Sequence, residues 1–549
     1  MTTPKNELLF LALGGSDEIG MNVNLYGCNG KWVMVDLGMT FSGGQYPGVD
    51  LVLPDLAFIE ERRSDLLGIV LTHGHEDHIG AIPYLAADLG VPLYATPFTA
   101  GLIRGKLAEE GLEAEVELNI IENSGSVALG PFTLSYVPLA HSILEGNALV
   151  IDTPYGRIFH TGDWKLDETP ILGVPATATQ LSAIGDSGVL AMVCDSTNVF
   201  NDTASGSEGS VEADLLDAVK SAKGRVVVTT FASNAARLKT LAKVAVKARR
   251  QLCVAGRSLD RIISVAQANG YLNDFPRLID FQAAMRLPPR EVMVIATGGQ
   301  GEDRAALARI ANDSHPIKLD AGDTVIFSSK QIPGNEIAIG AIQNQLARSG
   351  VIMVTEKQAH VHVSGHPGRP ELAAMYEWIR PEILLPVHGE RRHMAEQARF
   401  GLAQGIPKAL VQSNGDVVRL APNGPEIVGH ERTGRLLLDG DVILPADGGT
   451  INERRKLALY GIMSVAVAID GKGRLSGTPQ ITVLGIPVED ERAAFIGDID
   501  TAVRGVFGEH ERDDGKLRER IRLAARRVAT EWTGKKPLVE VLLIRTAAQ

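Results

Sequence analysis

Six consecutive residues, His73-Gly74-His75-Glu76-Asp77-His78, contain four side chains that commonly bind metal ions. An apolar run at residues 68–72 precedes them and predicts a buried strand. Residues 79–85 follow them and predict the first turns of a helix, with Pro83 tolerated near its start. A corner between a strand and a helix can direct consecutive imidazoles and a carboxylate toward one point. Imidazole suits zinc and Asp adds a hard oxygen, so the stretch predicts a metal site rather than a turn rich in His by chance.

The length of 549 residues is enough for two to four domains, each with its own core. The three cysteines, Cys28, Cys194 and Cys253, lie far apart, which indicates neither a disulfide framework nor a zinc site built from cysteines. The sequence contains neither a signal peptide at residues 1–7 nor an apolar run long enough to span a bilayer. We therefore expect a soluble protein in a reducing, cytoplasmic setting, with no membrane partner.

The charge is distributed unevenly along the chain. Its net charge is −12, but residues 1–209 hold 8 Lys+Arg against 27 Asp+Glu, a balance of −19. Residues 210–350 hold 19 against 13, a balance of +6. An acidic segment with the metal ligands is thus followed by a basic one, as an enzyme that acts on a polyanion would need. For any single Lys or Arg, a solvated helix face is the alternative explanation.

Short apolar runs alternate with glycine turns up to about residue 195. Residues 8–13, 32–35 and 148–151 predict strands, and residues 99–110 predict a helix. This alternation predicts sheets covered by helices, an α/β sandwich. A Ser/Gly/Glu-rich break at residues 203–210 marks a boundary.

Beyond that break, strand-helix units recur. The predicted pairs are 225–230 with 235–250, 251–256 with 259–269, 291–297 with 303–312, and 324–328 with 336–349. They predict a doubly wound parallel sheet inserted into the chain. Residues 350–355 then lead back into segments that contain His, so we expect the first domain to resume.

The segments after about residue 425 contain no further ligand-type motifs. Residues 429–455, rich in Gly, Asp and Arg, resemble a connector, and residues from about 460 predict a small α/β unit. Its basic stretch at residues 516–527 could contact RNA, with an ordinary surface helix as the alternative. The expected domains are therefore 1–209 and 351–428 (one sandwich), 210–350 (the insertion), 429–459 (a linker) and 460–549.

Further ligand-type residues follow predicted strands elsewhere in the chain: Asp36, His141, Asp163 and His388. Residues at the carboxyl ends of strands can converge on one edge of a sheet, where open sites usually form. Each of them alone fits a turn or a helix cap. Together they suit a hydrolase with two metal ions.

The chain resembles the metallo-β-lactamase superfamily at four motifs that occur in the order of that superfamily: Asp36, His73/His75/Asp77/His78, His141 and Asp163. Asp195, His366 and His388 resemble the three motifs of its β-CASP nuclease branch. Residues 14–22, 362–366 and 387–390 are similar to the bacterial ribonuclease J family. The resemblance covers the whole chain. It implies an α/β fold, namely an αββα metallo-β-lactamase sandwich with an inserted doubly wound β-CASP domain and a small C-terminal α/β domain.

The resemblance also implies roles for these residues. His73, His75 and His141 would bind one divalent metal ion, Asp77, His78 and His388 a second one, and Asp163 would bridge the two. Zinc is the expected metal, with manganese or magnesium as alternatives, and two such ions yield hydroxide near neutral pH. His366 would act as general acid or stabilise the phosphate, and it is grouped with Asp77 and Asp195 as catalytic. Asp36 and Asp195 would accept hydrogen bonds that fix imidazole tautomers.

A pocket for the RNA 5′-monophosphate and its base is implied at His362, Ser364, Phe231 and Ser233. Hydroxyls and imidazoles bind phosphate, and a Phe ring can stack on a base. Ser233 precedes a predicted helix, so helix capping is the alternative for it.

The implied activity is that of a metal-dependent ribonuclease. It would degrade 5′-monophosphorylated RNA 5′→3′ and would also cut RNA internally, in mRNA decay and rRNA processing. The expected substrate is single-stranded RNA, and the expected assembly is a homodimer or tetramer formed through the C-terminal region. The alternatives are a small-molecule hydrolase such as a thioesterase or lactonase, a DNA-repair nuclease of the β-CASP branch, and a non-catalytic RNA-binding scaffold. The family's DNA-repair members usually carry an aliphatic residue where this chain has His388, and a scaffold could lose ligands that are all present here.

Overall fold

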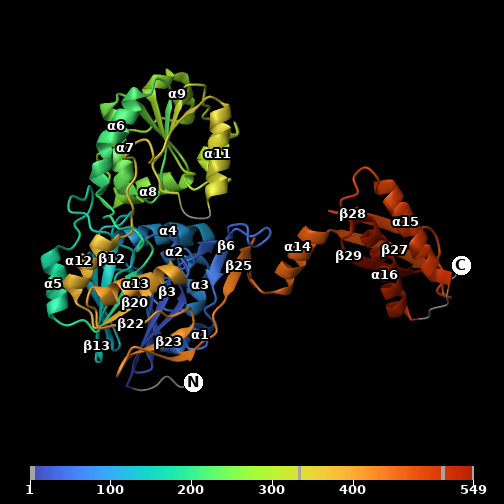
Figure 1. Cartoon of the computed structure of the whole chain (residues 1–549), viewed down its shortest axis with the longest axis horizontal. Helices are drawn as coiled ribbons and strands as arrows, with labels where there is room; N and C mark the ends of the chain where they lie inside the picture. Colours follow the sequence, from blue (N-terminus) through green and yellow to red (C-terminus); the bar gives the residue numbers. More distant parts are fainter. Residues whose placement is uncertain (1–5, 332–334, 509–512, 547–549) are drawn as a thin grey trace. The chain divides into compact units, whose positions relative to one another are not determined.

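The computed structural model describes residues 6–331, 335–508 and 513–546, and the chain divides into two units (Figure 1). The first unit comprises residues 1–40 and 53–435, and the second comprises residues 41–52 and 436–549. Short elements along the chain are β5 (Thr40–Phe41), β6 (Leu51–Pro54), α1 (Ala57–Glu60) and the 3₁₀ turns η1 (Arg63–Asp65), η2 (Glu208–Val211), η3 (Pro289–Glu291) and η4 (Val506–Gly508).

Two sheets form the inner layers of the first unit. The first sheet has the order β24 (Glu426–His430), β23 (Asp416–Ala421), β1 (Leu8–Gly14), β3 (Val23–Cys28), β4 (Lys31–Val35), β7 (Leu66–Val70), β8 (Leu93–Ala95) and β9 (Leu118–Ile120). The second has the order β10 (Ser126–Leu129), β11 (Phe132–Pro138), β12 (Asn147–Thr153), β13 (Gly156–His160), β14 (Ala191–Asp195), β20 (Ile383–Val387) and β22 (Lys408–Ala409). The strands expected at residues 8–13, 32–35 and 148–151 are confirmed, with small differences at their ends.

These two sheets pack face to face. Phe10 and Tyr26 of the first sheet share one apolar core with Leu134 and Ile151 of the second, and all four side chains are buried. Helices cover the outer faces: α3 (Ile82–Leu89), α4 (Pro97–Glu110), α5 (Ala178–Asp186), α12 (Arg369–Ile379) and α13 (Arg391–Ala403) (Figure 1). Burial on both faces explains why β1 is apolar throughout instead of alternating. The expected αββα sandwich is confirmed.

The inserted domain is a five-stranded sheet with every strand parallel. Its order is β16 (Gln251–Ala255), β17 (Val292–Ala296), β15 (Val226–Thr229), β18 (Thr324–Phe327) and β19 (Ile352–Val354). Its helices are α6 (Glu212–Ser221), α7 (Ala235–Lys247), α8 (Arg257–Ala268), α9 (Phe281–Arg286), α10 (Ala306–Ala311) and α11 (Glu336–Arg348). All four predicted strand-helix pairs are present. β19 pairs with β18, so the inserted sheet extends past residue 350, where we expected the first domain to resume.

The chain after the insertion completes both layers of the sandwich. β20 pairs in parallel with β14, and β23 pairs with β1, at sequence separations that span the whole insertion. The return of the chain to the first domain is therefore confirmed.

The second unit contains a small α/β domain. Its three-stranded sheet has the order β28 (Gln480–Leu484), β27 (Ile462–Ile469) and β29 (Leu538–Arg545), and α15 (Arg492–Gly505) and α16 (Asp514–Thr533) supply the apolar side chains that cover it. Every second residue of β27 is buried, as expected for a sheet with one covered face. The segment expected to be a connector contains the hairpin of β25 (Arg435–Asp439) and β26 (Val442–Pro445) and the helix α14 (Gly449–Tyr460). None of the helices described is long and apolar enough to cross a membrane.

Candidate metal centre

Each predicted ligand on the sandwich strands lies just past the carboxyl end of a strand. Asp36 follows β4 and His73 follows β7 on one sheet, and His141, Asp163 and His388 follow β11, β13 and β20 on the other. Because the two sheets pack together, these ends gather at one edge of the sandwich, as the sequence pattern predicted.

The His-rich corner forms two short helices where one was expected. α2 (Glu76–Ile79) begins directly after His75, and Gly80 and Ala81 separate it from α3, with Pro83 in the first turn of α3. A Cβ at Gly38 would lie 1.8 Å from the backbone oxygen of Asp77, so only glycine lets this corner pack against the end of β4.

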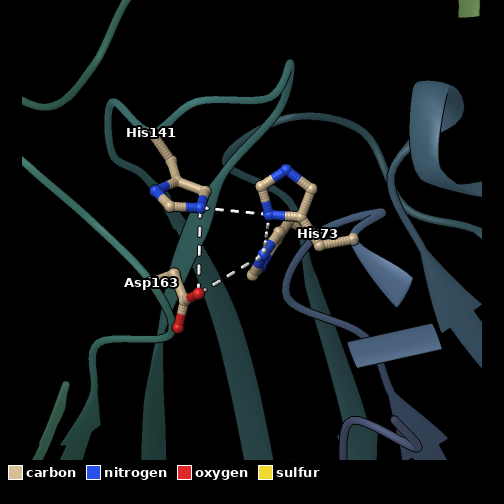
Figure 2. Close-up of side chains that lie close together, drawn as sticks. His73, His141 and Asp163 are labelled. Atoms are coloured by element: carbon tan, nitrogen blue, oxygen red, sulfur yellow. Dashed lines mark hydrogen bonds and ion pairs between the residues drawn. The ribbon is translucent and has the colours of Figure 1, made fainter. Parts of the chain in front are cut away.

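The first cluster of ligand atoms comprises His73, His75, His141 and Asp163, which lie within 4.8 Å of one another. Figure 2 shows His73, His141 and Asp163 turned toward a common point. The Oδ2 atom of Asp163 lies 3.7 Å from Nε2 of His141 and 3.9 Å from Nε2 of His73. Nδ1 of His75 lies 3.1 Å from Nε2 of His141. Three imidazoles and a carboxylate at such distances are a suitable donor set for one zinc-type ion.

The second cluster comprises Asp77, His78, Asp163 and His388. The same Oδ2 atom of Asp163 lies 3.2 Å from Nε2 of His78 and 3.3 Å from Nε2 of His388. Oδ2 of Asp77 lies 3.6 Å from each of these two imidazole nitrogens. Asp163 thus belongs to both clusters through one oxygen, so this carboxylate could contribute to the binding of an ion in either cluster.

Oxygen atoms on the outer side of the imidazoles fix their orientation. Nδ1 of His78 donates to Asp36 at 2.7 Å, and Nδ1 of His141 donates to the backbone oxygen of Gly365 at 2.6 Å. Nδ1 of His388 lies 3.0 Å from Oδ1 of Asn22. With Nδ1 protonated, the lone pair on Nε2 faces the cluster, which is the arrangement by which proteins orient metal-binding histidines.

His73 and His75 are oriented by hydroxyl groups. Nδ1 of His73 lies 3.0 Å from Oγ1 of Thr72, and that hydroxyl donates onward to Asp36 at 2.8 Å. His75 is reversed, because its Nε2 lies 2.9 Å from Oγ of Ser233 and its Nδ1 faces the cluster. Ser233 comes from the inserted domain, so that domain holds one of the candidate ligands directly.

Burial keeps most of these imidazoles neutral. Burial, reinforced by neighbouring imidazoles, lowers the pKa of His73 and His141 well below the usual value and that of His75 to about 4. Neutral imidazole is the form that binds metal. Burial also disfavours the charged form of His78, but Asp163, Asp77 and Asp36 outweigh it and raise its pKa. Burial alone would raise the pKa of Asp163, but His388 and His78 hold it well below the usual value, so this carboxyl stays ionised.

His366 lies beside both clusters, with its ring near those of His141 and His388. Its Nδ1 donates to Asp195 at 2.7 Å, and its ring stacks on that of His388 with an interplanar angle of 29° and centroids 5.6 Å apart. Burial opposes its protonation, but Asp195, Asp163 and Asp77 raise its pKa to about 9.

Hydrogen bonds place two of the four residues expected to form the 5′-phosphate pocket beside the clusters. Oγ of Ser364 accepts a hydrogen bond from the backbone N–H of His366, and Ser233 contacts His75, so both border the clusters. Among the described residues, no hydrogen bond joins the side chain of Phe231 or His362 to the clusters. Nδ1 of His362 is buried without a hydrogen-bond partner in the described chain, and burial together with Arg237 lowers its pKa to about 3.

Three groups that orient imidazoles were missed from the sequence: Asn22, Thr72 and the backbone oxygen of Gly365. Asn22 ends the glycine-rich stretch at residues 14–22. The short strands β2 (Ser16–Asp17) and β21 (Gly389–Glu390) pair and bring that stretch beside His388. The glycine-rich pattern was the available signal, but it did not indicate which residue of the stretch contacts the site.

Four family models match the chain. They are the metallo-beta-lactamase superfamily at residues 20–191, the ribonuclease J beta-CASP domain at 223–346, the Zn-dependent metallo-hydrolase RNA specificity domain at 351–406 and the ribonuclease J C-terminal domain at 449–546. Together they follow the order of the sandwich, the insertion, the return of the chain and the C-terminal domain.

Curated relatives match over nearly the whole chain. Ribonuclease J of Sinorhizobium meliloti is 42% identical over 98% of this chain and 97% of the relative. Ribonuclease J of Mycolicibacterium smegmatis is 36% identical, over 98% of this chain and 96% of the relative. Ribonuclease J of Corynebacterium glutamicum is also 36% identical, over 100% of this chain and 77% of the relative.

A crystal structure of a protein of unknown function from Enterococcus faecalis V583 has a similar fold, with a TM-score of 0.53 and 16% identity over 75% of this chain and 100% of that chain. That likeness concerns the fold alone. The curated relatives and the family models decide the family, and by them this chain belongs to the ribonuclease J family of metallo-β-lactamase/β-CASP ribonucleases.

Proposed function

We propose that the chain degrades RNA 5′→3′ from monophosphorylated ends and also cuts RNA internally, in mRNA decay and rRNA processing. The observation that supports the hydrolytic centre best is the single Asp163 oxygen that lies within 4 Å of imidazole nitrogens from both clusters. We assign His73, His75 and His141 to one divalent ion, Asp77, His78 and His388 to the other, and Asp163 to both. Zinc is our proposed metal, with manganese or magnesium as alternatives; two bound ions lower the pKa of a water and neutralise charge on the phosphate.

The protein residues supply the proton and the positioning. Hydroxide attacks phosphorus in line with the 3′ oxygen of the preceding nucleotide, the bond between phosphorus and that oxygen breaks, and a 5′-phosphate remains on the downstream product. His366 gives the departing oxygen its proton, and Asp195 holds the His366 ring in the orientation that allows this transfer. Ser364, His362, Phe231 and Ser233 are proposed to bind the terminal 5′-phosphate and its base.

Purified protein incubated with RNA that carries a 5′-monophosphate, a 5′-triphosphate or no free end (a circle) tests this activity. We expect mononucleotides from the monophosphorylated RNA, little exonuclease product from the triphosphorylated RNA, slow opening of the circle and no cleavage with a chelator. His75→Ala and Asp77→Ala should abolish cleavage, while His430→Ala, at an exposed position of the edge strand β24 that belongs to neither cluster, should not. Turnover of a thioester or lactone with RNA left intact would favour the small-molecule hydrolase, and RNA binding without cleavage would favour the scaffold.

Two further assignments rest on the family and on the RNA substrate. We propose a cytoplasmic enzyme that acts on single-stranded RNA as a homodimer or tetramer formed through the C-terminal region. Sedimentation of the full chain and of a chain that ends at residue 435 should give an oligomer and a monomer, respectively. An unchanged oligomer after truncation would contradict the assignment to the C-terminal region.

A further inference from the structure

A cavity of about 500 Å³ in the second unit is surrounded by positive charge. It lies between the end of α14, the middle of α16 and the loop from α16 to β29. The cationic and aromatic side chains that line it are Lys456 and Tyr460 from α14, Arg522 and Arg526 from α16, and Lys535 and Lys536 from the loop. Among the described residues that line it, Glu540 is the only acidic one, in a chain whose net charge is −12.

Among the described contacts, two of these five cations have side-chain hydrogen bonds, and Arg526 interacts electrostatically with Glu519. Arg522 donates to both carboxylate oxygens of Glu519, at 2.7 and 2.6 Å, and Nζ of Lys535 donates to the backbone oxygen of Leu459 at 3.1 Å. In the part of the chain that the structure describes, Lys456 and Lys536 make no side-chain hydrogen bond or ion pair. Nε of Arg526 is buried there without a hydrogen-bond partner. Like charges gathered around one cavity raise the local concentration of anions.

Stabilisation of helix ends does not explain the cluster. Cations favour the C-terminal end of a helix, and Lys535 acts in this way on α14. The effect is confined to the last turn, whereas Arg522 and Arg526 lie well before Thr533, where α16 ends. An exposed aromatic ring, Tyr460, also lines the cavity and is 40% accessible.

We propose that this cavity is a second binding site for single-stranded RNA, in which phosphates contact Lys456, Lys536 and Arg526 and a base stacks on Tyr460. The inference rests on the proposed function, because that function makes RNA the ligand that the protein meets. A cationic groove with an aromatic platform is the general means of binding single strands without sequence preference, and the volume suits a nucleotide. A duplex offers the same phosphates but hides the faces of its bases, so an unpaired strand fits better. A second site on the same chain raises the affinity for long substrates over short ones.

The variant Lys456→Gln/Lys536→Gln of the full chain tests this site. Its matched control is Lys472→Gln/Lys516→Gln, which removes the same two charges from the same domain at exposed positions that do not line the cavity. Binding of a fluorescent single-stranded RNA of about 30 nucleotides is measured by anisotropy in chelator over a range of salt concentrations. We expect the cavity variant to bind roughly tenfold more weakly and the slope of log Kd against log salt to fall by about 1.4, because each lost phosphate contact removes about 0.7. The control should match the wild type.

Two further measurements distinguish the possible results. Tyr460→Leu should weaken binding of the single strand about fivefold and leave binding of a duplex unchanged, as loss of a stacked base requires. The metal-loaded cavity variant should cleave a monophosphorylated RNA of about five nucleotides at the wild-type rate. The proposal is overturned if the cavity variant binds like the wild type, if the control loses as much affinity, or if Tyr460→Leu has no effect. Failure of the wild type to cleave any RNA would instead contradict the proposed function. The RNA affinities of the wild type and the variants could still be compared in that case.

Discussion

Single hydrogen bonds decide which nitrogen of each histidine faces the metal centre. Asp36 orients His78 directly and His73 through Thr72, so one buried carboxylate acts on both clusters. Asn22 acts in this way on His388, because its Oδ1 lies 3.0 Å from Nδ1 of that ring, while its Nδ2 lies 3.0 Å from Nε2 of His78. Residues of this kind bind no metal themselves, yet they determine the geometry of those that do.

Asn22→Leu should lower the affinity for metal by about 10- to 100-fold, the usual cost of losing an outer partner. The side chain keeps its size but can no longer hold Nδ1 of His388, whose ring then loses its fixed orientation. Metal affinity is measured by competition with a chromogenic chelator, with circular dichroism as the check on folding. Asn24→Leu on β3 is the control, since the side-chain oxygen of Asn24 is buried without a partner in the described chain. Equal metal affinity in the Asn22→Leu and wild-type proteins would refute this role.

His366→Gln should lower kcat by about 10²- to 10⁴-fold, the range of a general acid, while metal content stays near the wild-type value. Glutamine retains a hydrogen bond to Asp195 but provides no acidic proton. Single-turnover cleavage and metal analysis of the same sample separate the two effects. A parallel loss of metal would instead make His366 a ligand, as the cluster of Asp163, Asp195, His366 and His388 allows.

Among the elements, η2 and α7 join the inserted domain to the sandwich through buried charges. Nε of Arg237 donates to Glu208 at 3.0 Å, Nη2 of Arg237 lies 2.9 Å from the same oxygen as an ion pair, and Lys165 of the sandwich lies 4.0 Å from the same carboxylate. All three side chains are at most 3% exposed. Ser233 precedes the same helix and contacts His75, so this junction sets the position of the inserted domain at the metal centre.

Glu208→Gln should destabilise the protein by about 3–5 kcal/mol, because it leaves Arg237 buried without its carboxylate and Lys165 with only Asp167 as an ion-pair partner among the described residues. Glu212→Gln, on the neighbouring helix α6, is the matched control. Its partner Lys247 is 53% exposed, and exposed ion pairs contribute about 0–1 kcal/mol. Chemical denaturation followed by tryptophan fluorescence measures both. If the two variants lose the same stability, the buried charges do not hold the junction.

Elements that depend on local sequence could be predicted, and contacts between distant segments could not. Apolar runs and turn residues located β1, β4, β12 and the four strand-helix pairs, because hydrophobic periodicity is a local signal. The strand-end positions of Asp36, His141 and His388 followed in the same way. The pairing of β2 with β21, 373 positions apart at Ser16 and Gly389, left no local trace, so the role of Asn22 was missed. The same reason explains Ser233, whose contact with His75 depends on how the inserted domain packs.

In the chain as a whole, the C-terminal domain has a core of its own. Phe495, Ile499 and Ile521 are fully buried against strand β27, and all members of this core come from residues 463–543. A domain of this size can bury enough apolar surface to fold independently. The inserted domain also has its own apolar core, but it shares buried charges with the sandwich, and the chain after it completes the sandwich sheets.

Residues 449–546 expressed alone should therefore unfold in one cooperative thermal transition, with an enthalpy of about 60–80 kcal/mol for a domain of roughly 100 residues. Two substitutions on α16 make the test specific. Ile521→Ala removes a side chain with no exposed surface and should cost about 2–5 kcal/mol, whereas Leu523→Ala, at a side chain that is 46% exposed, should cost much less. Differential scanning calorimetry of the three fragments measures both quantities. A broad, non-cooperative transition, or equal effects of the two substitutions, would mean that this domain depends on the rest of the chain to fold.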